Sequence, residues 1–207
     1  MHARIWGALL VSLGAVGCGN SQDATTDASV PDASVDAPTS ISGTVAVPLK
    51  SIGGGYTAQL SIGGQPFDVI ADTGSSSTGV AAATCANCAV HPLYTPPATA
   101  MDLGFPASSQ YGQGSWKGEV FEDAAAMASL PGVPLDFASI TSQTGFFQGP
   151  LFQGILGLGP DGLLLPHTTS YISKLFAAGM TQELAFQMCP DDGTMWLGGY
   201  DASKAAG

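Results

Sequence analysis

The sequence predicts an all-β fold, and three observations lead to that prediction. The chain has 207 residues, enough for one domain with a core of its own. Glycine and proline are frequent, at 28 and 14 residues, whereas charged residues make up only 10% of the chain. Short segments also alternate between apolar and polar residues. Together these features are typical of many short strands joined by turns.

The first predicted strands lie ahead of the most informative motif of the chain. Residues 56–62 alternate apolar and polar side chains, as a half-buried strand does, and Gly63 and Gly64 then mark a turn. Residues 67–71 form an apolar strand that runs directly into Asp72.

The following segments complete the predicted sheet. Residues 109–118 are rich in glycine and predict a hairpin, with an outgoing strand from Glu119. Residues 153–159 form a short apolar strand whose glycines allow other backbone to pass closely. Residues 184–188 and 194–197 are two further predicted strands.

One helix is predicted, over residues 168–180. Tyr171 and Leu175 share one of its faces, because residues four apart lie one above the other on a helix. Either threonine at its start, 168 or 169, can cap it, and Gly179 can end it.

The first 42 residues are expected to lie outside the globular domain. Residues 1–18 have the pattern of an export signal, with an apolar stretch too short to span a bilayer comfortably. Its end resembles a bacterial lipobox, in which Cys18 would carry the lipid. Residues 19–42 contain no aromatic residue and predict a disordered acidic linker. The globular domain is therefore assigned to residues 43–207, in an exported protein that is held at the outer membrane or cell surface as a lipoprotein, or otherwise secreted.

The charge of the chain excludes one class of partner. The formal net charge is −11, and no cluster of basic residues offsets it. Such a surface repels a phosphate backbone, so nucleic-acid binding is not expected. Contact with a membrane is expected only through the lipid anchor.

The sequence Asp72-Thr73-Gly74-Ser75 is the strongest indication of chemistry. An acidic side chain at the end of an apolar strand, at the mouth of a tight turn, can be held at a fixed point facing a cleft. Gly74 allows a close approach of backbone, and the Ser75 hydroxyl can reach the carboxylate.

The order of the motifs resembles the N-terminal lobe of the pepsin-like aspartic proteases, from about residue 48 to residue 201. The segments that carry the resemblance are Tyr56 with Ile62-Gly63-Gly64-Gln65-Pro66, Asp72-Thr73-Gly74-Ser75, Tyr111-Gly112-Gln113-Gly114-Ser115, Gly154-Ile155-Leu156-Gly157-Leu158-Gly159 and 193–201. The resemblance implies twisted β-sheets with one short helix. The family carries the Asp-Thr-Gly loop once in each lobe, and it occurs once here, so the second lobe is expected to be absent from this chain.

The resemblance also implies roles for particular residues. Asp72 would be catalytic, with Thr73, Gly74 and Ser75 supporting its loop. The substrate-binding flap would be formed by Tyr111, Gly112, Gln113 and Gly114. No cofactor and no metal are implied, and the substrate would be a polypeptide.

Three functions follow from the single Asp-Thr-Gly loop. In the first, the chain is the first lobe of an exported aspartic endopeptidase, and the missing C-terminal lobe supplies the second carboxylate. In the second, a second copy of the chain supplies it, in a single-lobe homodimer. In the third, a catalytically inactive surface lipoprotein uses the fold to bind peptides or proteins. A lone Asp72 is expected to be ionised and catalytically idle.

The cysteines leave three interpretations open. Cys85 and Cys88 follow the Asp-Thr-Gly loop, where the family has a small disulfide-closed loop, so the resemblance implies a disulfide. A redox pair and a zinc site that includes His91 are the alternatives. Cys189 is expected to have no partner within the chain. Two departures from the family pattern are Gly79, where tryptophan is common, and Gln153, where aspartate is common.

Overall fold

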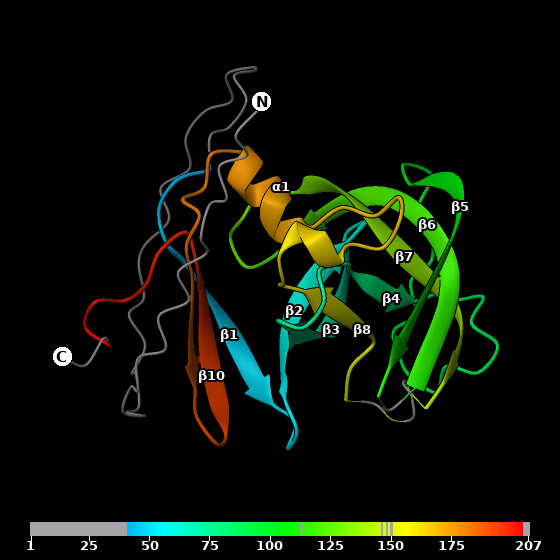
Figure 1. Ribbon diagram of the computed structural model, residues 1–207, viewed down its shortest axis with the longest axis horizontal. Helices are drawn as coiled ribbons and strands as arrows, with labels where there is room; N and C mark the ends of the chain where they lie inside the picture. Colours follow the sequence, from blue (N-terminus) through cyan, green and yellow to red (C-terminus); the bar gives the residue numbers. More distant parts are fainter. Residues whose placement is uncertain (1–40, 113, 146, 148, 150, 205–207) are drawn as a thin grey trace, which may run out of the picture.

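The computed structural model describes residues 41–204, except residues 113, 146, 148 and 150. Within these residues the fold consists mainly of strands, with one short α-helix and one turn of 3-10 helix, so the all-β prediction is confirmed (Figure 1). The predicted signal segment with Cys18, most of the predicted linker and the flap residue Gln113 lie outside the described residues.

The strands include all the predicted ones, in the predicted order along the chain, and further strands before and between them. They are β1 (Val45–Ser51), β2 (Tyr56–Ile62), β3 (Gln65–Asp72), β4 (Gly79–Ala81), β5 (Met101–Tyr111), β6 (Gly114–Ala126), β7 (Val133–Thr144), β8 (Gly154–Gly157), β9 (Leu184–Met188) and β10 (Asp192–Leu197). The 3-10 turn η1 covers Asp161–Leu163 and the helix α1 covers Tyr171–Ala177.

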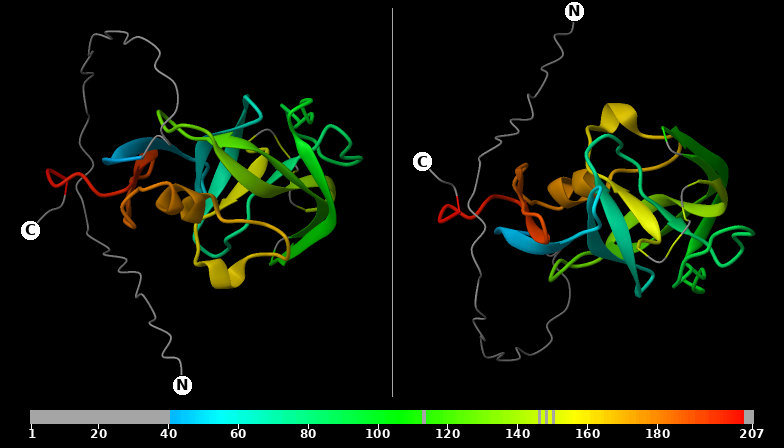
Figure 2. Two further views of the ribbon diagram at one scale, coloured as in Figure 1. Left: turned by 90° about the horizontal axis from the view of Figure 1, so that it is seen from above. Right: turned by 90° about the horizontal axis from the view of Figure 1, so that it is seen from below.

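All these strands belong to one strongly curved sheet. Its order is β5-β6-β7-β4-β8-β3-β2-β1-β10-β9, and a further pairing of β6 with β2 closes the central strands on themselves. β1, β10 and β9 extend from this closed part to one side, while the long β5–β6 hairpin lies on the other (Figures 1 and 2). The β3–β8 and β4–β7 pairs are parallel, and they lie at the centre of the sheet order.

The helix is shorter than predicted. It begins after Ser170, whose hydroxyl accepts a hydrogen bond from the Ser173 N–H at 3.2 Å. The predicted caps at 168 and 169 are therefore wrong, because both threonines bond other segments: Thr168 bonds Ser77, and Thr169 accepts from the Asp136 N–H. Gly179 follows the last turn with a positive φ of 105°, which agrees with the predicted end of the helix.

The domain begins at least as early as Ile41. This residue is buried, and its N–H donates to the carbonyl oxygen of Ala178 at 3.0 Å. Among the described residues, no helix has the length and apolar character needed to cross a membrane.

A cluster of aromatic side chains fills the closed part of the sheet. The Tyr94 ring makes edge contacts with Phe67, Phe121 and Phe137, at centroid distances of 6.3, 6.5 and 5.2 Å. Its hydroxyl donates to the buried carboxylate of Asp123 at 2.8 Å. Burial, with a smaller contribution from Asp123, raises the pKa of Tyr94 above its ordinary value, so Tyr94 remains a donor through the acidic and neutral range.

Tyr94→Phe is expected to destabilise the domain by about 1–3 kcal/mol, because it leaves the buried Asp123 carboxylate without one of its donors. The measurement is urea unfolding at neutral pH, with Tyr200→Phe as control, since Tyr200 is 57% exposed. A Tyr94→Phe variant as stable as the Tyr200→Phe variant would contradict this role for the buried pair.

Candidate active site

Asp72 is the last residue of β3 and is partly buried. β3 runs parallel to β8, and the register sets Asp72 opposite Gly157. Phe67 and Val69 of β3 and Leu156 of β8 lie in the main core cluster, which fixes the point where the carboxylate leaves the sheet. The site therefore lies where the paired parallel strands end.

The Asp72 carboxylate is held by its own loop. Its Oδ1 accepts the Gly74 N–H at 2.8 Å, and its Oδ2 accepts the Ser75 hydroxyl at 2.6 Å. Thr73 lies between them and is exposed. Both carboxylate oxygens thus have a donor three residues away or less, and these donors orient the carboxylate before any ligand binds.

The chain after β8 braces this loop from one side. The Leu158 N–H donates to the Asp72 carbonyl oxygen, and the Gly159 N–H donates to that of Ser75, both at 2.8 Å. The Ser76 hydroxyl donates to the carbonyl oxygen of Pro160 at 2.5 Å. These bonds join segments more than 80 residues apart, so the loop is fixed by the tertiary structure and not only by its own turn.

A second brace comes from the segment before the helix. The hydroxyls of Ser77 and Thr168 are 2.7 Å apart, and the Ser77 Oγ also accepts the Leu165 N–H at 2.8 Å. Sequence reasoning missed Ser76, Ser77 and Thr168. The run of four hydroxyl residues at 75–78 was a usable indication, because buried hydroxyls in a tight loop require partners.

The predicted flap is the tip of the β5–β6 hairpin. The Gln110 Nε2 bonds the carbonyl oxygens of Tyr111 and Gly114, both at 3.1 Å, and so ties the two sides of the tip together. The partly buried Tyr111 packs against a second core cluster that contains Trp116. The structure thus brings Asp72, Gly74 and Ser75 into one network, and it sets Tyr111, Gly112 and Gly114 on a separate hairpin.

Comparison with known proteins identifies relatives of this chain. Residues 55–207 match the family model described as eukaryotic aspartyl protease. The chain belongs to the eukaryotic aspartyl protease family. It is 34% identical over 167 residues to a vacuolar aspartic protease of Candida albicans, covering 73% of this chain and 40% of the relative. It is 32% identical over 166 residues to cathepsin E of Rattus norvegicus, covering 73% and 42%.

This aspartyl protease chain thus spans about two-fifths of the length of the relatives that it matches. An aspartic protease of Phaffia rhodozyma gives the same result, at 31% identity over 157 residues, 73% of this chain and 39% of the relative.

The two departures from the family pattern have local structural reasons. Gly79 is buried in β4, where a Cβ would lie 3.1 Å from the Ile140 side chain and 3.4 Å from that of Ala138, so no large side chain fits. Trp116 of β6 packs in the same cluster as Tyr111 and Ile140. Gln153 is buried and makes a reciprocal pair with Asp68, accepting from its N–H at 2.9 Å and donating its own N–H to the Asp68 carbonyl oxygen at 2.8 Å.

The structure decides part of the question of how the cysteines are bonded. Cys85 and Cys88 form a disulfide, the pairing implied by the resemblance, which leaves neither thiol for a zinc site with His91. The expectation that Cys189 has no partner within the chain is wrong, because Cys189 is also disulfide-bonded. Among the described residues, no three His, Cys, Asp or Glu side chains are grouped to bind a metal ion.

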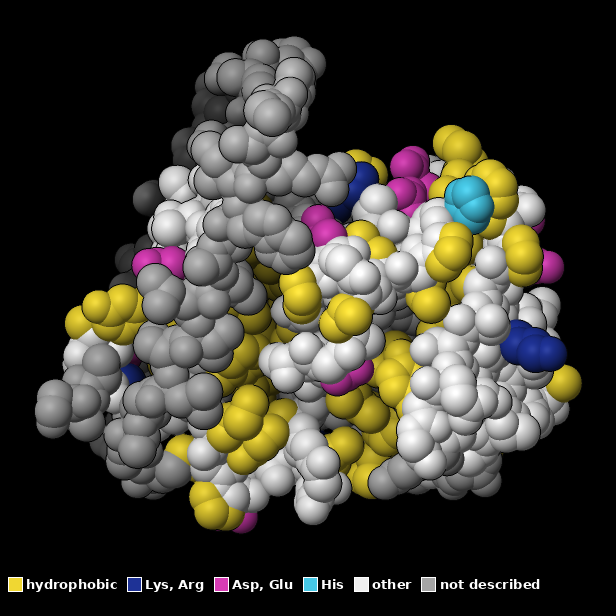
Figure 3. Space-filling view, in the orientation of Figure 1, with side chains coloured by type: hydrophobic (Ala, Val, Ile, Leu, Met, Phe, Trp, Pro, Cys, Tyr) yellow, Lys and Arg dark blue, Asp and Glu magenta, His cyan; other side chains and the backbone are white. Residues whose placement is uncertain are grey.

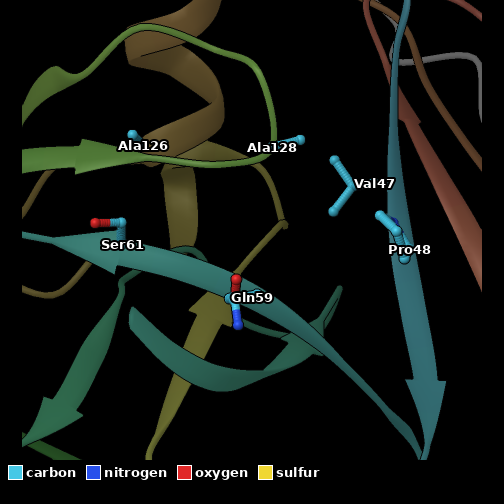
Figure 4. A pocket seen from close by; sticks show the side chains of 6 residues that line it. All are labelled: Val47, Pro48, Gln59, Ser61, Ala126 and Ala128. Atoms are coloured by element: carbon cyan, nitrogen blue, oxygen red, sulfur yellow. The ribbon is translucent and has the colours of Figure 1, made fainter. Parts of the chain in front are cut away.

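A pocket of about 380 Å³ lies elsewhere in this domain, between β1 on one side and β2 with the end of β6 on the other (Figure 4). None of the predicted site residues lines it; the lining residues are Val47, Pro48, Gln59, Ser61, Ala126 and Ala128. The face drawn in Figure 3 carries scattered acidic side chains and few basic ones, in keeping with the net charge of −11.

Proposed function

We propose that this protein is an exported aspartic endopeptidase in which Asp72 supplies one of two catalytic carboxylates. The observation that carries the proposal is the Asp72 carboxylate itself, which is partly buried and oriented by the Gly74 N–H and the Ser75 hydroxyl. Membership of the aspartyl protease family supports peptide-bond hydrolysis as the reaction. The substrate is a polypeptide.

The chemistry requires a second carboxylate close to Asp72. Two neighbouring carboxylates cannot easily both ionise, so they share a proton and titrate as a pair, and aspartic proteases are themselves the standard example. The ionised carboxylate removes a proton from a water molecule as that water attacks the peptide carbonyl carbon, and the protonated one assists as an acid. Asp72 alone performs neither half efficiently.

The second carboxylate comes from a C-terminal lobe, because the relatives that this chain matches are about two and a half times as long as the matched part. The alternative source is a second copy of this chain in a homodimer. A third reading is a lipoprotein that keeps the fold for binding peptides or proteins without cleaving them.

Proteolysis measured against protein concentration separates these readings. The 207-residue chain alone is expected to show little or no pepstatin-sensitive cleavage of a denatured protein between about pH 3 and pH 7, since half of the carboxylate pair is missing. Joining the chain to a C-terminal lobe of a matched relative is expected to produce cleavage that is first order in protein.

Three other results would overturn the two-lobe reading. Activity of the chain alone that rises steeply with its concentration would favour the homodimer. Efficient proteolysis by a monomer would contradict the requirement for a second carboxylate altogether. A well-folded chimera that binds pepstatin without cleaving any substrate would favour the binding protein.

Export and anchoring rest on the N-terminal sequence. Cys18 is proposed as a lipidation site, which would hold the protein at the outer membrane or cell surface, and a secreted protein is the alternative. In a bacterial host that lipidates exported proteins, Cys18→Ala is expected to move the protein from the membrane fraction to the soluble fraction. Lipidation of Cys18 competes with the disulfide of Cys189, because Cys85 and Cys88 pair with each other and Cys18 is the one cysteine left. A Cys18–Cys189 peptide in a non-reducing digest would therefore exclude lipidation and favour the secreted protein.

A further inference from the structure

The disulfide loop Cys85–Cys88 continues the sheet where β4 ends. β4 pairs with β7 only as far as Ala81, which lies opposite Ile140. Beyond this point the backbone groups on that edge of β7 need other partners. Ala82, just after β4, and Ala86, within the loop, supply them. The Ala82 N–H donates to the Ile140 carbonyl oxygen at 2.9 Å, and the Ala86 N–H donates to that of Thr141 at 3.2 Å.

Asn87 makes the last and densest of these contacts. Its side-chain Nδ2 donates to the Gln143 carbonyl oxygen at 2.5 Å, and its Oδ1 accepts the Gln143 N–H at 3.0 Å. In return, the Gln143 Nε2 donates to the Asn87 carbonyl oxygen at 2.7 Å. The Asn87 amide therefore takes the place of a peptide group of a neighbouring strand. We call these three bonds the Asn87–Gln143 clasp.

The clasp also fixes the segment that follows β7. Gln143 is buried, and its Oε1 accepts the Phe147 N–H at 3.1 Å. Phe147 is fully buried in the second core cluster together with Trp116, and its carbonyl oxygen accepts the Ala89 N–H at 3.2 Å. Gln143 thus links the disulfide loop, through Asn87, to the second core cluster, through Phe147.

The other edge of β7 carries the stem of the β5–β6 hairpin. Trp116 lies opposite Gln143, and Ser115 lies opposite Thr144, with their hydroxyl oxygens 2.8 Å apart. Gly114 lies so close to the Thr144 carbonyl oxygen that a Cβ there would overlap it. The hairpin tip therefore begins at the residues that β7 fixes in place.

We infer that Asn87, held by the Cys85–Cys88 disulfide, is a positioning residue that acts through Gln143 and β7 on the described residues of the hairpin tip, Tyr111, Gly112 and Gly114. An isolated two-stranded hairpin end is only marginally stable in water, so its position depends on the strand beside it. The inference rests on the proposed function only in treating this tip as the flap over the substrate. The positioning itself can be measured without catalysis.

The test is amide hydrogen exchange of the full chain, resolved by mass spectrometry of its peptides. Asn87→Ala removes both side-chain bonds of the clasp and is expected to raise exchange about tenfold at 114–118 and 141–147, because these two bonds hold Gln143 and the end of β7 in place. Exchange in β1 and β10 is expected to stay unchanged. Asn87→Asp keeps the acceptor for the Gln143 N–H but sets a carboxylate oxygen against the Gln143 carbonyl oxygen, so a rise at least as large is expected.

Two further variants complete the design. Thr84→Ala removes a polar side chain from an exposed position just before the same loop, and it is expected to leave exchange unchanged. The double variant Cys85→Ser/Cys88→Ser is expected to reproduce the pattern of Asn87→Ala. A rise confined to 85–88 and 141–147, with residues 114–118 unchanged, would overturn the inference. So would an equal rise in β1 and β10, which would indicate general destabilisation.

The chain joined to a C-terminal lobe, the form expected to cleave protein, gives an independent readout. There Asn87→Ala is expected to raise KM about tenfold, with a smaller change in kcat, because a displaced flap weakens substrate binding. An unchanged KM would count against the positioning role. Absence of proteolysis in the parent protein would count against the proposed function alone, since the exchange measurement would still decide the inference.

Discussion

Asp72→Asn is expected to reduce kcat by about 10³-fold or more while leaving the fold intact, because the proposed reaction requires Asp72 as a proton-transferring group. The asparagine Oδ1 can still accept the Gly74 N–H that the carboxylate accepts at 2.8 Å. Its Nδ2 can donate to the Ser75 hydroxyl, which reverses the direction of the 2.6 Å bond. The loop therefore keeps its shape and loses its charge. The measurement is kcat of the chain joined to a C-terminal lobe, together with the free energy of unfolding in urea.

The matched control is Asp68→Asn. It removes the same charge from the same strand, four residues earlier, at a position whose backbone bonds Gln153. The control is expected to retain nearly full activity. Equal losses in both variants would indicate a general effect of charge, and full activity of Asp72→Asn would exclude Asp72 from the chemistry.

Gly157→Ala is expected to destabilise the domain by about 3 kcal/mol or to prevent folding, because overpacking against fixed backbone is costly. A Cβ at position 157 would overlap the backbone of Ser76 and Ser77, which belongs to the loop that carries Asp72. Where the variant folds, activity should also fall, since relief of the overlap must move that loop. The free energy of unfolding and kcat/KM measure the two effects.

Gly54→Ala serves as the control for backbone entropy. No heavy atom lies within 4 Å of a Cβ built at Gly54, so the added methyl group meets nothing. Its effect is expected to stay within about 0.5 kcal/mol, as for most surface substitutions. If Gly157→Ala proved as mild as Gly54→Ala, the close packing of β8 against the Asp72 loop would not be the constraint that the structure indicates.

The sequence predicted best those parts of the fold whose pattern is local. The alternation at Tyr56–Ile62 and the apolar run into Asp72 correspond to β2 and β3. β1, β4 and β7 were not predicted: β4 has only three residues, Pro48 interrupts β1, and Pro134 lies near the start of β7. Proline discourages assignment to a strand because it lacks a donor N–H, yet Pro48 and Pro134 both take part in antiparallel pairs here.

The candidate site shows the same limit. Asp72, Gly74 and Ser75 lie next to one another in the sequence, and their contacts follow from the turn that they form. The bonds of Ser76 to Pro160 and of Ser77 to Thr168 join residues more than 80 apart, and no local pattern indicates such partners. The helix boundary failed for this reason as well, because both predicted capping threonines bond distant strands or loops.

The pairing of β1 with β10 determines when this domain can complete its folding during synthesis. The end of β1 pairs at once with β2, at Lys50 and Ser51, but Val45 lies opposite Leu197, so most of β1 pairs only after some 150 further residues have been made. During synthesis, most of β1 therefore stays unpaired until β10 has been made. The Asp72 loop likewise lacks its braces until the carbonyl of Pro160 and the hydroxyl of Thr168 have been made. The Asp72 loop is therefore fixed in one late step. Until then the unpaired strand edges of the chain are exposed to aggregation.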